Sequence, residues 1–470
     1  MAIQPLIHKK DVILVKPAEP TPFEVLSLST IDNDRTIEVL YQTVYAYKMN
    51  SLTSLDPAMV IKEALSKVLV YYYPLAGKLK RDDGKLRITC NADGVPFLEA
   101  YADCELSSLN YLDGIDSGMA KLLAFDWPSE SECGYHPLLL SVTKFSCGGF
   151  TIGMVLSHSV CDGFGAAQFY KAMAELASGK SEPMVKPVWE RERLVGAASK
   201  DPILPPIDMS TLANSPFLPS TVIAQESFYL SGETIGKLKM SFLRELEKTE
   251  DANFTTVEIL GAYVWRSRSR ALQLTPNGKT MFSMVMGIRN VLNPPLDAGY
   301  YGNAFFCSSD LVLTVRDLNE LPLSKVAKLI KESKKALTSS TDFVPKTLDN
   351  LETIIQQKVD VEISDGACME LTDWRQLGLM EEVDFGWKEM VNMVPLLWNN
   401  FSTNLCMFLP PCKVDSSMKT KGGVRVLVTL PKAAMAKMKE EMECLNQLGV
   451  DHIEKQSKPA MNSIYHPSNL

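Results

Sequence analysis

The residues best suited to chemistry in this sequence are His158 and Asp162. His158 follows an apolar run that ends at Ser157, and Asp162 stands four residues later, directly before Gly163. An imidazole with a pKa near about 6.5 is mostly neutral at neutral pH and can accept a proton, and a nearby carboxylate can orient its ring. The same residues also fit a histidine that only packs and an aspartate that caps a helix. The spacing therefore allows acid–base chemistry without requiring it.

Two potential nucleophiles, Ser159 and Cys161, lie beside His158. A nucleophile and its base this close along a chain rarely work together unless a third group orients the base. We therefore expect neither side chain to form a covalent intermediate.

The position of His158 depends on a predicted hairpin and helix. Residues 138–145 and 150–157 are apolar and rich in strand formers, and Gly148 and Gly149 between them tolerate a tight turn. Beyond residue 163, apolar residues recur at helical spacing as far as Gly179. His158 is thus expected in a strand-to-helix turn, where a side chain can face a cleft while the strand holds it in place.

Two motifs far apart resemble one enzyme family. HSVCDG, which begins at His158, resembles the HxxxDG motif of the plant BAHD acyl-CoA-dependent acyltransferases, and DFGW, which begins at Asp384, resembles their DFGWG motif. The resemblance covers essentially the whole chain. Within the family, KPVWERERLVG, LTDWRQLG and MGIRNVLNPPLDAGYYGNA are most similar to the branch of spermidine hydroxycinnamoyl transferases.

The resemblance implies an α/β fold with mixed sheets. Two chloramphenicol-acetyltransferase-like domains would be joined by a long crossover linker, with the active site in a channel between them. The length of 470 residues suits two domains. Residues 182–221 contain seven prolines and form the expected linker. We expect an N-terminal domain over residues 1–181, which carries HxxxD, and a C-terminal domain over residues 222–470, which carries DFGW.

The resemblance also implies a mechanism and roles at the site. The acceptor would attack the acyl-CoA directly in a ternary complex, with His158 as general base and Trp387 as a donor to the oxyanion. Asp162 would point away from His158 and pair with Arg289, although a dyad in which Asp162 orients the imidazole stays open. The other residues expected to shape these loops are Gly163, Asp384 and Gly386. Lys388 stands where the family usually has glycine.

Substrate contacts are less clearly marked. Thr255 and Glu258 form a capping-box pattern, and the free backbone N–H groups of such a helix start suit a phosphate. The region resembles a coenzyme A contact of the family, so the resemblance makes Thr255 and Thr256 candidates for binding coenzyme A, although an ordinary capped helix is the simpler explanation. The candidates for docking a cationic acceptor are Glu381, Glu382 and Glu389, which could instead be solvated surface charges.

Composition limits the partners. The net charge of −8 and pI near 5.4 argue against nucleic acid or an anionic membrane but not against a cationic small molecule. No stretch approaches the ~18 apolar residues of a membrane span, and the N-terminus lacks a secretory pattern. Ten cysteines show no metal-ligand spacing. We expect a cytoplasmic monomer with no metal and no permanent cofactor, for which acyl-CoA is a co-substrate.

The sequence supports three alternative hypotheses about function. The leading hypothesis is transfer of a hydroxycinnamoyl or similar aromatic acyl group from coenzyme A to an amine, in particular a polyamine such as spermidine. The second is O-acylation of an alkaloid, terpenoid or phenolic hydroxyl with a benzoyl, acetyl or hydroxycinnamoyl donor. The third is a non-catalytic protein that binds acyl-CoA.

Overall fold

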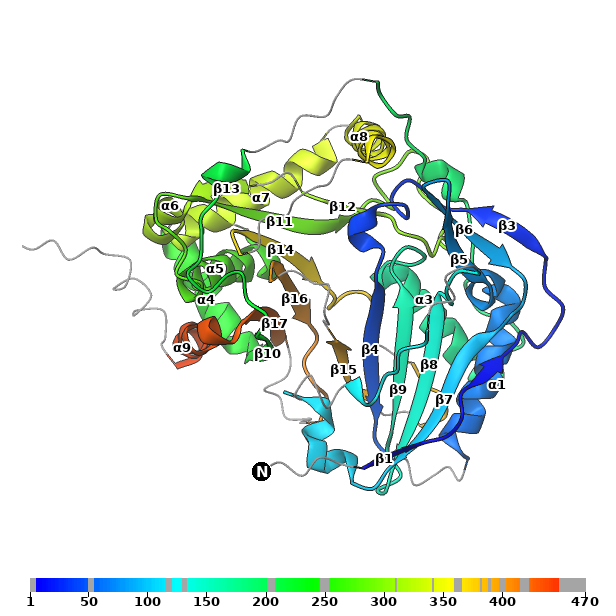
Figure 1. Cartoon of the computed structure of the whole chain (residues 1–470). Coiled ribbons are helices and arrows are strands. Elements are labelled where there is room, and N and C mark those ends of the chain that lie inside the picture. Colours follow the sequence, from blue (N-terminus) through cyan, green and yellow to red (C-terminus); the bar gives the residue numbers. More distant parts are fainter. Residues whose placement is uncertain are drawn as a thin grey trace, which may run out of the picture.

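Two mixed β-sheets lie side by side in the computed structural model and organise the rest of the chain (Figure 1). The structure describes residues 6–49, 55–114, 121–128, 133–200, 208–245, 253–308, 311–339, 342–358, 366–380, 383–387, 390–396, 403–414 and 422–447. All structural statements below concern these ranges.

The first sheet has seven described strands and contains the predicted hairpin. In spatial order its strands are β1 (Ile7–Lys9), β7 (Val95–Ala102), β8 (Leu138–Phe145), β9 (Phe150–Ser157), β4 (Leu40–Tyr47) and β15 (Met390–Leu396), with β2 (Ile13–Val15) also paired to β7. β8 and β9 are antiparallel, and Gly148 in the turn between them has φ +79°, a conformation that glycine adopts without strain. Every residue of β9 is buried, so the strand is a rigid support for the residue that follows it.

The second sheet also has seven described strands. In spatial order they are β10 (Ile223–Leu230), β17 (Val424–Pro431), β16 (Leu405–Leu409), β14 (Cys368–Asp373), β11 (Lys279–Gly287) and β12 (Phe305–Cys307), with β13 (Leu311–Thr314) also paired to β11. A smaller sheet contains β3 (Glu24–Ser27), β6 (Lys85–Cys90) and β5 (Lys78–Asp82).

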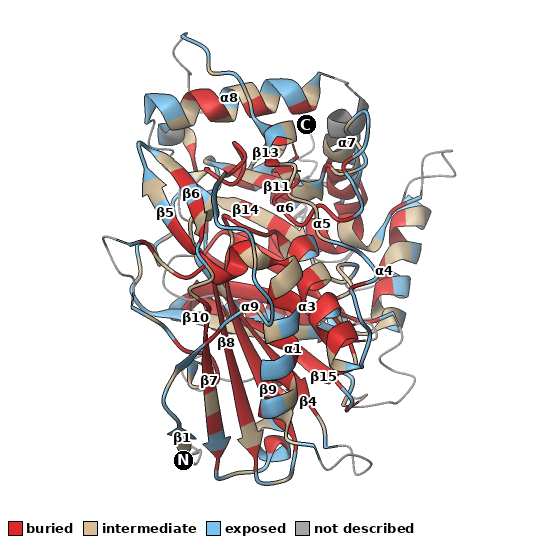
Figure 2. Cartoon of the chain, turned by 90° about the vertical axis from the view of Figure 1, so that its right-hand side faces the viewer, coloured by how far each residue is buried: buried red, intermediate tan, exposed pale blue. Residues whose placement is uncertain are grey.

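Helices cover the sheets and bury their apolar faces. α1 (Pro57–Tyr71) and α3 (Gly163–Ala177) pack on the first sheet (Figure 2). Around the second sheet and its neighbourhood lie α4 (Gly232–Glu245), α5 (Thr256–Ala271), α6 (Val315–Glu320), α7 (Leu323–Ser339), α8 (Phe343–Gln357) and α9 (Lys432–Gln447). Short 3-10 segments are η1 (Arg35–Ile37), η2 (Tyr73–Ala76), η3 (Leu106–Leu112), η4 (Arg191–Leu194) and η5 (Met209–Thr211). None of the described helices is long and apolar enough to cross a bilayer.

Strand β15 connects the two halves of the chain. It follows β14 of the second sheet in sequence, yet it pairs with β4 of the first sheet over Met390 to Leu396. The first hydrophobic core likewise includes Leu405, Met407 and Leu427 from the second sheet. The two sheets therefore share a core, and the expected domain boundaries at residues 181 and 222 remain a prediction.

The expected linker packs closely where it is described. The indole of Trp189 donates to the carbonyl oxygen of Ser27 at 3.2 Å, and Val188 forms a β-bridge with Tyr300. Arg191 is buried between these contacts. The proline-rich segment thus fills the space between early and late parts of the chain.

Helix α3 closely approaches the second half of the chain at Gly165. A methyl group added there would overlap the carbonyl oxygen of Tyr301. We expect Gly165→Ala to destabilise the protein by about 1 to 3 kcal/mol, because a tightly packed site cannot absorb the added volume. Gly236→Ala is the matched control, since Gly236 is exposed in α4 with open space around it. This change should stabilise by about 0.5 to 1 kcal/mol. Thermal unfolding of both variants tests the pair, and equal melting temperatures would contradict this account of Gly165.

Candidate active site

His158 lies where the two halves of the chain meet, one residue beyond β9. Its backbone N–H donates to the carbonyl oxygen of Val39 at 2.9 Å, which fixes the start of the turn. The imidazole packs edge-on against the ring of Tyr41, with centroids 4.7 Å apart, and near the ring of Phe305 at 5.6 Å. The predicted strand-to-helix turn is confirmed, and aromatic rings from β4 and β12 hold the imidazole between them.

Asn303 determines which nitrogen of His158 carries the proton. Its side-chain N–H groups donate to the carboxylate of Asp32 at 2.7 Å and to the carbonyl oxygen of His158 at 2.6 Å. Both partners can only accept, so the amide oxygen must be the atom that faces His158 Nδ1, at 3.1 Å. A neutral imidazole then has its proton on Nδ1 and its lone pair on Nε2. Such a ring is prepared to accept a proton at Nε2.

A buried ion pair holds Asn303 in turn. One guanidinium nitrogen of Arg191 donates to both oxygens of Asp32, at 2.9 and 3.1 Å, and the other donates to the carbonyl oxygen of Val160 at 2.8 Å. The guanidinium also lies over the ring of Trp189, 4.4 Å from its centroid. The side chains of Asp32 and Arg191 are almost completely buried. Asp32, Arg191 and Asn303 were not predicted as site residues, although Arg191 and Asn303 lie in the family-like segments KPVWERERLVG and MGIRNVLNPPLDAGYYGNA.

Asp162 binds Arg289 through both carboxylate oxygens. The two N–H···O distances are 2.8 Å, and the same carboxylate accepts from the backbone N–H of Gly165 at 2.9 Å and of Ala304 at 3.1 Å. Asp162 thus caps α3 and connects it to Arg289 at the same time. The expected pair is present, and His158 Nδ1 faces Asn303 rather than Asp162, which disfavours the dyad.

Gly163 and the DFGW loop lie where contacts and backbone conformation constrain the residue types. A side chain at Gly163 would meet Leu377 across the cavity described below. In the loop, the carboxylate of Asp384 accepts from the backbone N–H of Gly386 at 2.7 Å, and Gly386 has φ +101°. These contacts suit the loop-shaping role expected for Asp384 and Gly386.

Trp387 is far from His158, which corrects the expected oxyanion role. Its buried ring packs against Phe150, with centroids 5.1 Å apart, and Phe150 begins β9 whereas His158 follows its end. An eight-residue strand at about 3.3 Å per residue separates the two by roughly 25 Å. An indole at that distance cannot donate to an oxyanion formed at His158. The resemblance identified the DFGW motif correctly but did not show how far the motif lies from His158.

The remaining expected contacts are not brought to His158. Thr255 and Glu258 form the capping box, with Thr255 N–H donating to the Glu258 carboxylate at 2.8 Å, and α5 begins at Thr256. Neither threonine lines the described cavity around His158. Binding of coenzyme A by Thr255 and Thr256 remains a prediction. Glu381, Glu382 and Glu389 lie outside the described residues, as does Lys388.

A cavity of about 910 Å³ opens in front of His158. Its described lining has four carboxylates and two guanidinium groups, which belong to Glu38, Asp162, Glu370, Asp373, Arg35 and Arg289. Three of these carboxylates are paired with arginines: Asp162 with Arg289, Glu38 with Arg81 and Asp373 with Arg375. Aromatic walls come from Tyr41, Phe305 and Trp374. Thr372 and Trp374, whose side chains carry a hydroxyl and an indole N–H, also line the cavity. Neither Glu370 nor Trp374 was singled out from the sequence.

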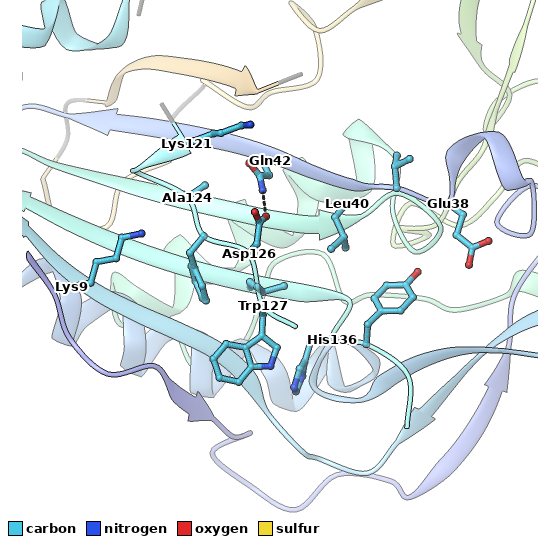
Figure 3. Close-up of a pocket in the computed structure, with 13 residues that line it drawn as sticks. Lys9, Glu38, Leu40, Gln42, Lys121, Ala124, Asp126, Trp127 and His136 are labelled. Carbon is cyan, nitrogen blue, oxygen red and sulfur yellow. Dashed lines mark hydrogen bonds between the residues drawn. The ribbon is translucent and has the colours of Figure 1, made fainter. Parts of the chain in front are cut away.

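A second cavity, of about 660 Å³, lies on the opposite face of β4 (Figure 3). Leu40 and Gln42 face it, while the alternating residues Tyr41 and Thr43 face the His158 side. The Gln42 amide donates to Asp126 at 2.8 Å on the floor of this second cavity. The sheet therefore separates the two cavities along β4.

Burial favours the neutral forms of His158 and Cys161 in the turn. Burial lowers the pKa of His158 below its usual value, partly opposed by the negative charge of Asp162. The imidazole is therefore neutral at neutral pH and able to accept a proton. Burial also raises the pKa of the Cys161 thiol well above its usual range, so the thiolate needed for nucleophilic attack is disfavoured.

Comparison with known proteins agrees with this fold. The solved structure of vinorine synthase superposes with a TM-score of 0.72 over 94% of this chain and 98% of that chain, at 22% sequence identity. This likeness confirms the expected mixed α/β fold with two sheet-rich, chloramphenicol-acetyltransferase-like parts. The Transferase family matches residues 7–445. The chain belongs to this family, which confirms its resemblance to the BAHD acyl-CoA-dependent acyltransferases.

Two curated relatives are more similar in sequence. One is the spermidine coumaroyl-CoA acyltransferase of Arabidopsis thaliana, 45% identical over 94% of this chain and 96% of the relative. Another is the spermidine sinapoyl-CoA acyltransferase of the same plant, 42% identical over 94% of this chain and 97% of the relative. With the family, these relatives show that the chain is an acyl-CoA-dependent acyltransferase.

The contacts of Asp162 predict a loss of stability when it is removed. Asp162→Ala leaves Arg289 partly buried without its carboxylate and removes the cap of α3, so we expect a cost of about 3 to 5 kcal/mol in folding free energy. Asp162→Asn keeps a capping oxygen and should cost less. Thermal or denaturant unfolding measures both. Unchanged stability together with lost activity would instead show that Asp162 acts on His158.

Proposed function

We propose that this enzyme transfers an aromatic acyl group, such as a hydroxycinnamoyl group, from coenzyme A to a nitrogen of a polyamine such as spermidine, with His158 as general base. The observation that best supports this proposal is the pair of hydrogen bonds donated by Asn303, which leaves Nε2 of His158 as the proton acceptor in a cavity lined by carboxylates and aromatic rings. The names of the two Arabidopsis relatives, a spermidine coumaroyl-CoA and a spermidine sinapoyl-CoA acyltransferase, support the same donor and acceptor classes.

In the proposed reaction, the amine nitrogen attacks the thioester carbonyl carbon. Its proton passes to Nε2 of His158, the tetrahedral intermediate collapses, and the carbon–sulfur bond breaks. The imidazolium then returns the proton to the departing thiolate of coenzyme A. The low pKa of buried His158 suits both steps, because the base begins neutral and releases its proton readily.

Transfer is direct, without an acyl-enzyme. The buried Cys161 thiol is disfavoured as a nucleophile, as described above. The developing oxyanion needs a hydrogen-bond donor within the same cavity. We assign this role to Thr372 or Trp374 in place of Trp387, because both line the cavity with His158.

The acceptor class follows from charge. Four carboxylates and the rings of Tyr41, Phe305 and Trp374 line the cavity, and such acceptors and ring faces suit an alkylammonium ion better than an anion or a neutral alcohol. This supports N-acylation over the O-acylation of a plant specialised metabolite. A non-catalytic acyl-CoA-binding role is disfavoured by family membership and by the prepared tautomer of His158.

The broader setting is also part of the proposal. We place the enzyme in the cytoplasm as a monomer of plant specialised metabolism, with acyl-CoA and a small-molecule acceptor as its partners. It would need neither nucleic acid nor membrane, and acyl-CoA would be a co-substrate rather than a resident cofactor. The two sheets with the linker between them would form the walls of the channel.

His158→Ala tests the general base. We expect kcat to fall by about 10² to 10⁴ with the melting temperature retained, because a positioned base contributes roughly that factor. Cys161→Ala is the control and should retain most of the activity, since no covalent intermediate is proposed. Turnover of coumaroyl-CoA with spermidine, followed by release of free thiol, measures both variants. An active, folded His158→Ala protein would rule out this mechanism.

The pH profile separates amine from alcohol acceptors. An alkylamine with a pKa near about 10.4 is mostly protonated at pH 7, so its reactive fraction grows about tenfold per pH unit. His158 adds nothing to this rise, since its lowered pKa keeps it neutral throughout. We therefore expect kcat/KM for spermidine to rise from pH 7 to 9, whereas an alcohol acceptor should give a level profile. A flat spermidine profile, or an alcohol preferred at every pH, would favour O-acylation.

A further inference from the structure

The second cavity, on the face of β4 away from the imidazole, adjoins the cavity of His158. Glu38 and Val39, which directly precede β4, line both cavities. The carbonyl oxygen of Val39 accepts from the backbone N–H of His158 at 2.9 Å, so this shared border lies directly beside His158. The two cavities are thus separated along β4 and adjoin before the strand begins.

Three aromatic rings line the second cavity together with aliphatic side chains. The rings are those of Phe125, Trp127 and Tyr135, and Leu40 and Leu139 add aliphatic surface. Phe125 and Leu139 belong to the hydrophobic core on this face of the first sheet, and Trp127 packs against that core. The volume of about 660 Å³ lies within the range of sites for small molecules. These features suit an aromatic ligand.

The charged groups of the second cavity do not favour a free polyamine. Lys9 and Lys121 contribute ammonium groups to its lining. The described lining also has two carboxylates, and both are engaged. Glu38 binds Arg81 at 2.6 and 3.0 Å, and Asp126 accepts an amide N–H from β4 at 2.8 Å (Figure 3). A polycation would therefore meet like charges and occupied carboxylates, whereas a neutral aromatic group meets no such cost.

The aromatic lining lies within reach of an acceptor that reacts at His158. Gln42 stands three residues beyond Val39, and three residues of strand span roughly 10 Å. The amide of Gln42 donates to Asp126 at 2.8 Å, and Trp127 follows Asp126. In a spermidine that already carries one hydroxycinnamoyl amide, about nine bonds separate the ring from the next nitrogen across a four-carbon spacer, which is roughly 11 Å in an extended chain. The two lengths agree.

We infer that the second cavity binds the aromatic amide of a polyamine that has already been acylated once, while another nitrogen of the same molecule reacts at His158. This deepens the proposed function and rests on it. A polyamine keeps amine nitrogens after its first acylation, and its new aromatic amide suits the second cavity better than the starting polyamine does. The second transfer is the same reaction: a nitrogen–carbon bond forms, the carbon–sulfur bond breaks, and the proton passes through His158 to the departing thiolate. The enzyme thus binds its first product as a new acceptor.

Trp127→Ala tests the inference, with N-coumaroylspermidine acylated on one terminal nitrogen as the acceptor. KM for this acceptor should rise about 5- to 30-fold with kcat nearly unchanged, because the contact between the indole and the ligand ring is lost. KM for spermidine should not change, since the unacylated molecule does not occupy the second cavity. Trp127→Phe keeps an aromatic ring and should retain most of the affinity. Phe23→Ala is the matched control: Phe23 is 80% exposed and lines neither described cavity, so its loss should alter neither KM.

The outcomes separate the inference from the function. A folded Trp127→Ala protein that keeps the wild-type KM for N-coumaroylspermidine, or that raises KM equally for both acceptors, would overturn the inference and leave polyamine acylation intact. A wild-type enzyme that acylates no amine would overturn both. If Trp127→Ala does not fold, the wild-type protein still decides: KM for N-coumaroylspermidine should be lower than KM for N-acetylspermidine, whose amide carries no ring. Equal KM values for these two acceptors would overturn the inference.

Discussion

The buried pair of Arg191 and Asp32 is the interaction on which the site depends. Removing two charges from water is costly, and a buried ion pair often adds little net stability. Here the pair acts by position. The Asp32 carboxylate forces the amide of Asn303 into one orientation, and that amide forces the imidazole of His158 into one tautomer. The Asp32 carboxylate, which takes no part in the proposed reaction, thereby determines which nitrogen of His158 can accept a proton.

A second ion pair lies on the other side of His158. The pair of Asp162 and Arg289 binds the start of α3, while the pair of Asp32 and Arg191 binds the turn after β9 through the carbonyl oxygen of Val160. Both carboxylates also accept backbone N–H groups from residues 303 and 304. The short segment at residues 303 and 304 therefore contacts both ion pairs and fixes their positions relative to each other. The imidazole is placed by its hydrogen bond to Asn303 and by edge-on and tilted packing against Tyr41 and Phe305.

The sequence predicted what depends on local pattern. Apolar periodicity and paired glycines located the hairpin before His158, and capping residues located the starts of α3 and α5. The contact between Asn303 and Asp32 joins residues 271 positions apart, and no periodicity reports such a contact. The oxyanion role expected for Trp387 was not supported for a related reason. A motif preserves residue types, but the distance from Trp387 to His158 is set by the length of β9, which the motif does not contain.

The chain returns to its first sheet very late. β4 pairs with β9 on one side, and its other edge is covered by β15, which ends at Leu396. During synthesis the hairpin of β8 and β9 is complete some 230 residues before that edge can close. Unpaired strand edges promote association with other chains. The growing polypeptide must therefore protect the free edge of β4 while most of its second half is still being made. For the same reason, an N-terminal half cut off at the linker would lack β15, and its β4 edge would stay unpaired.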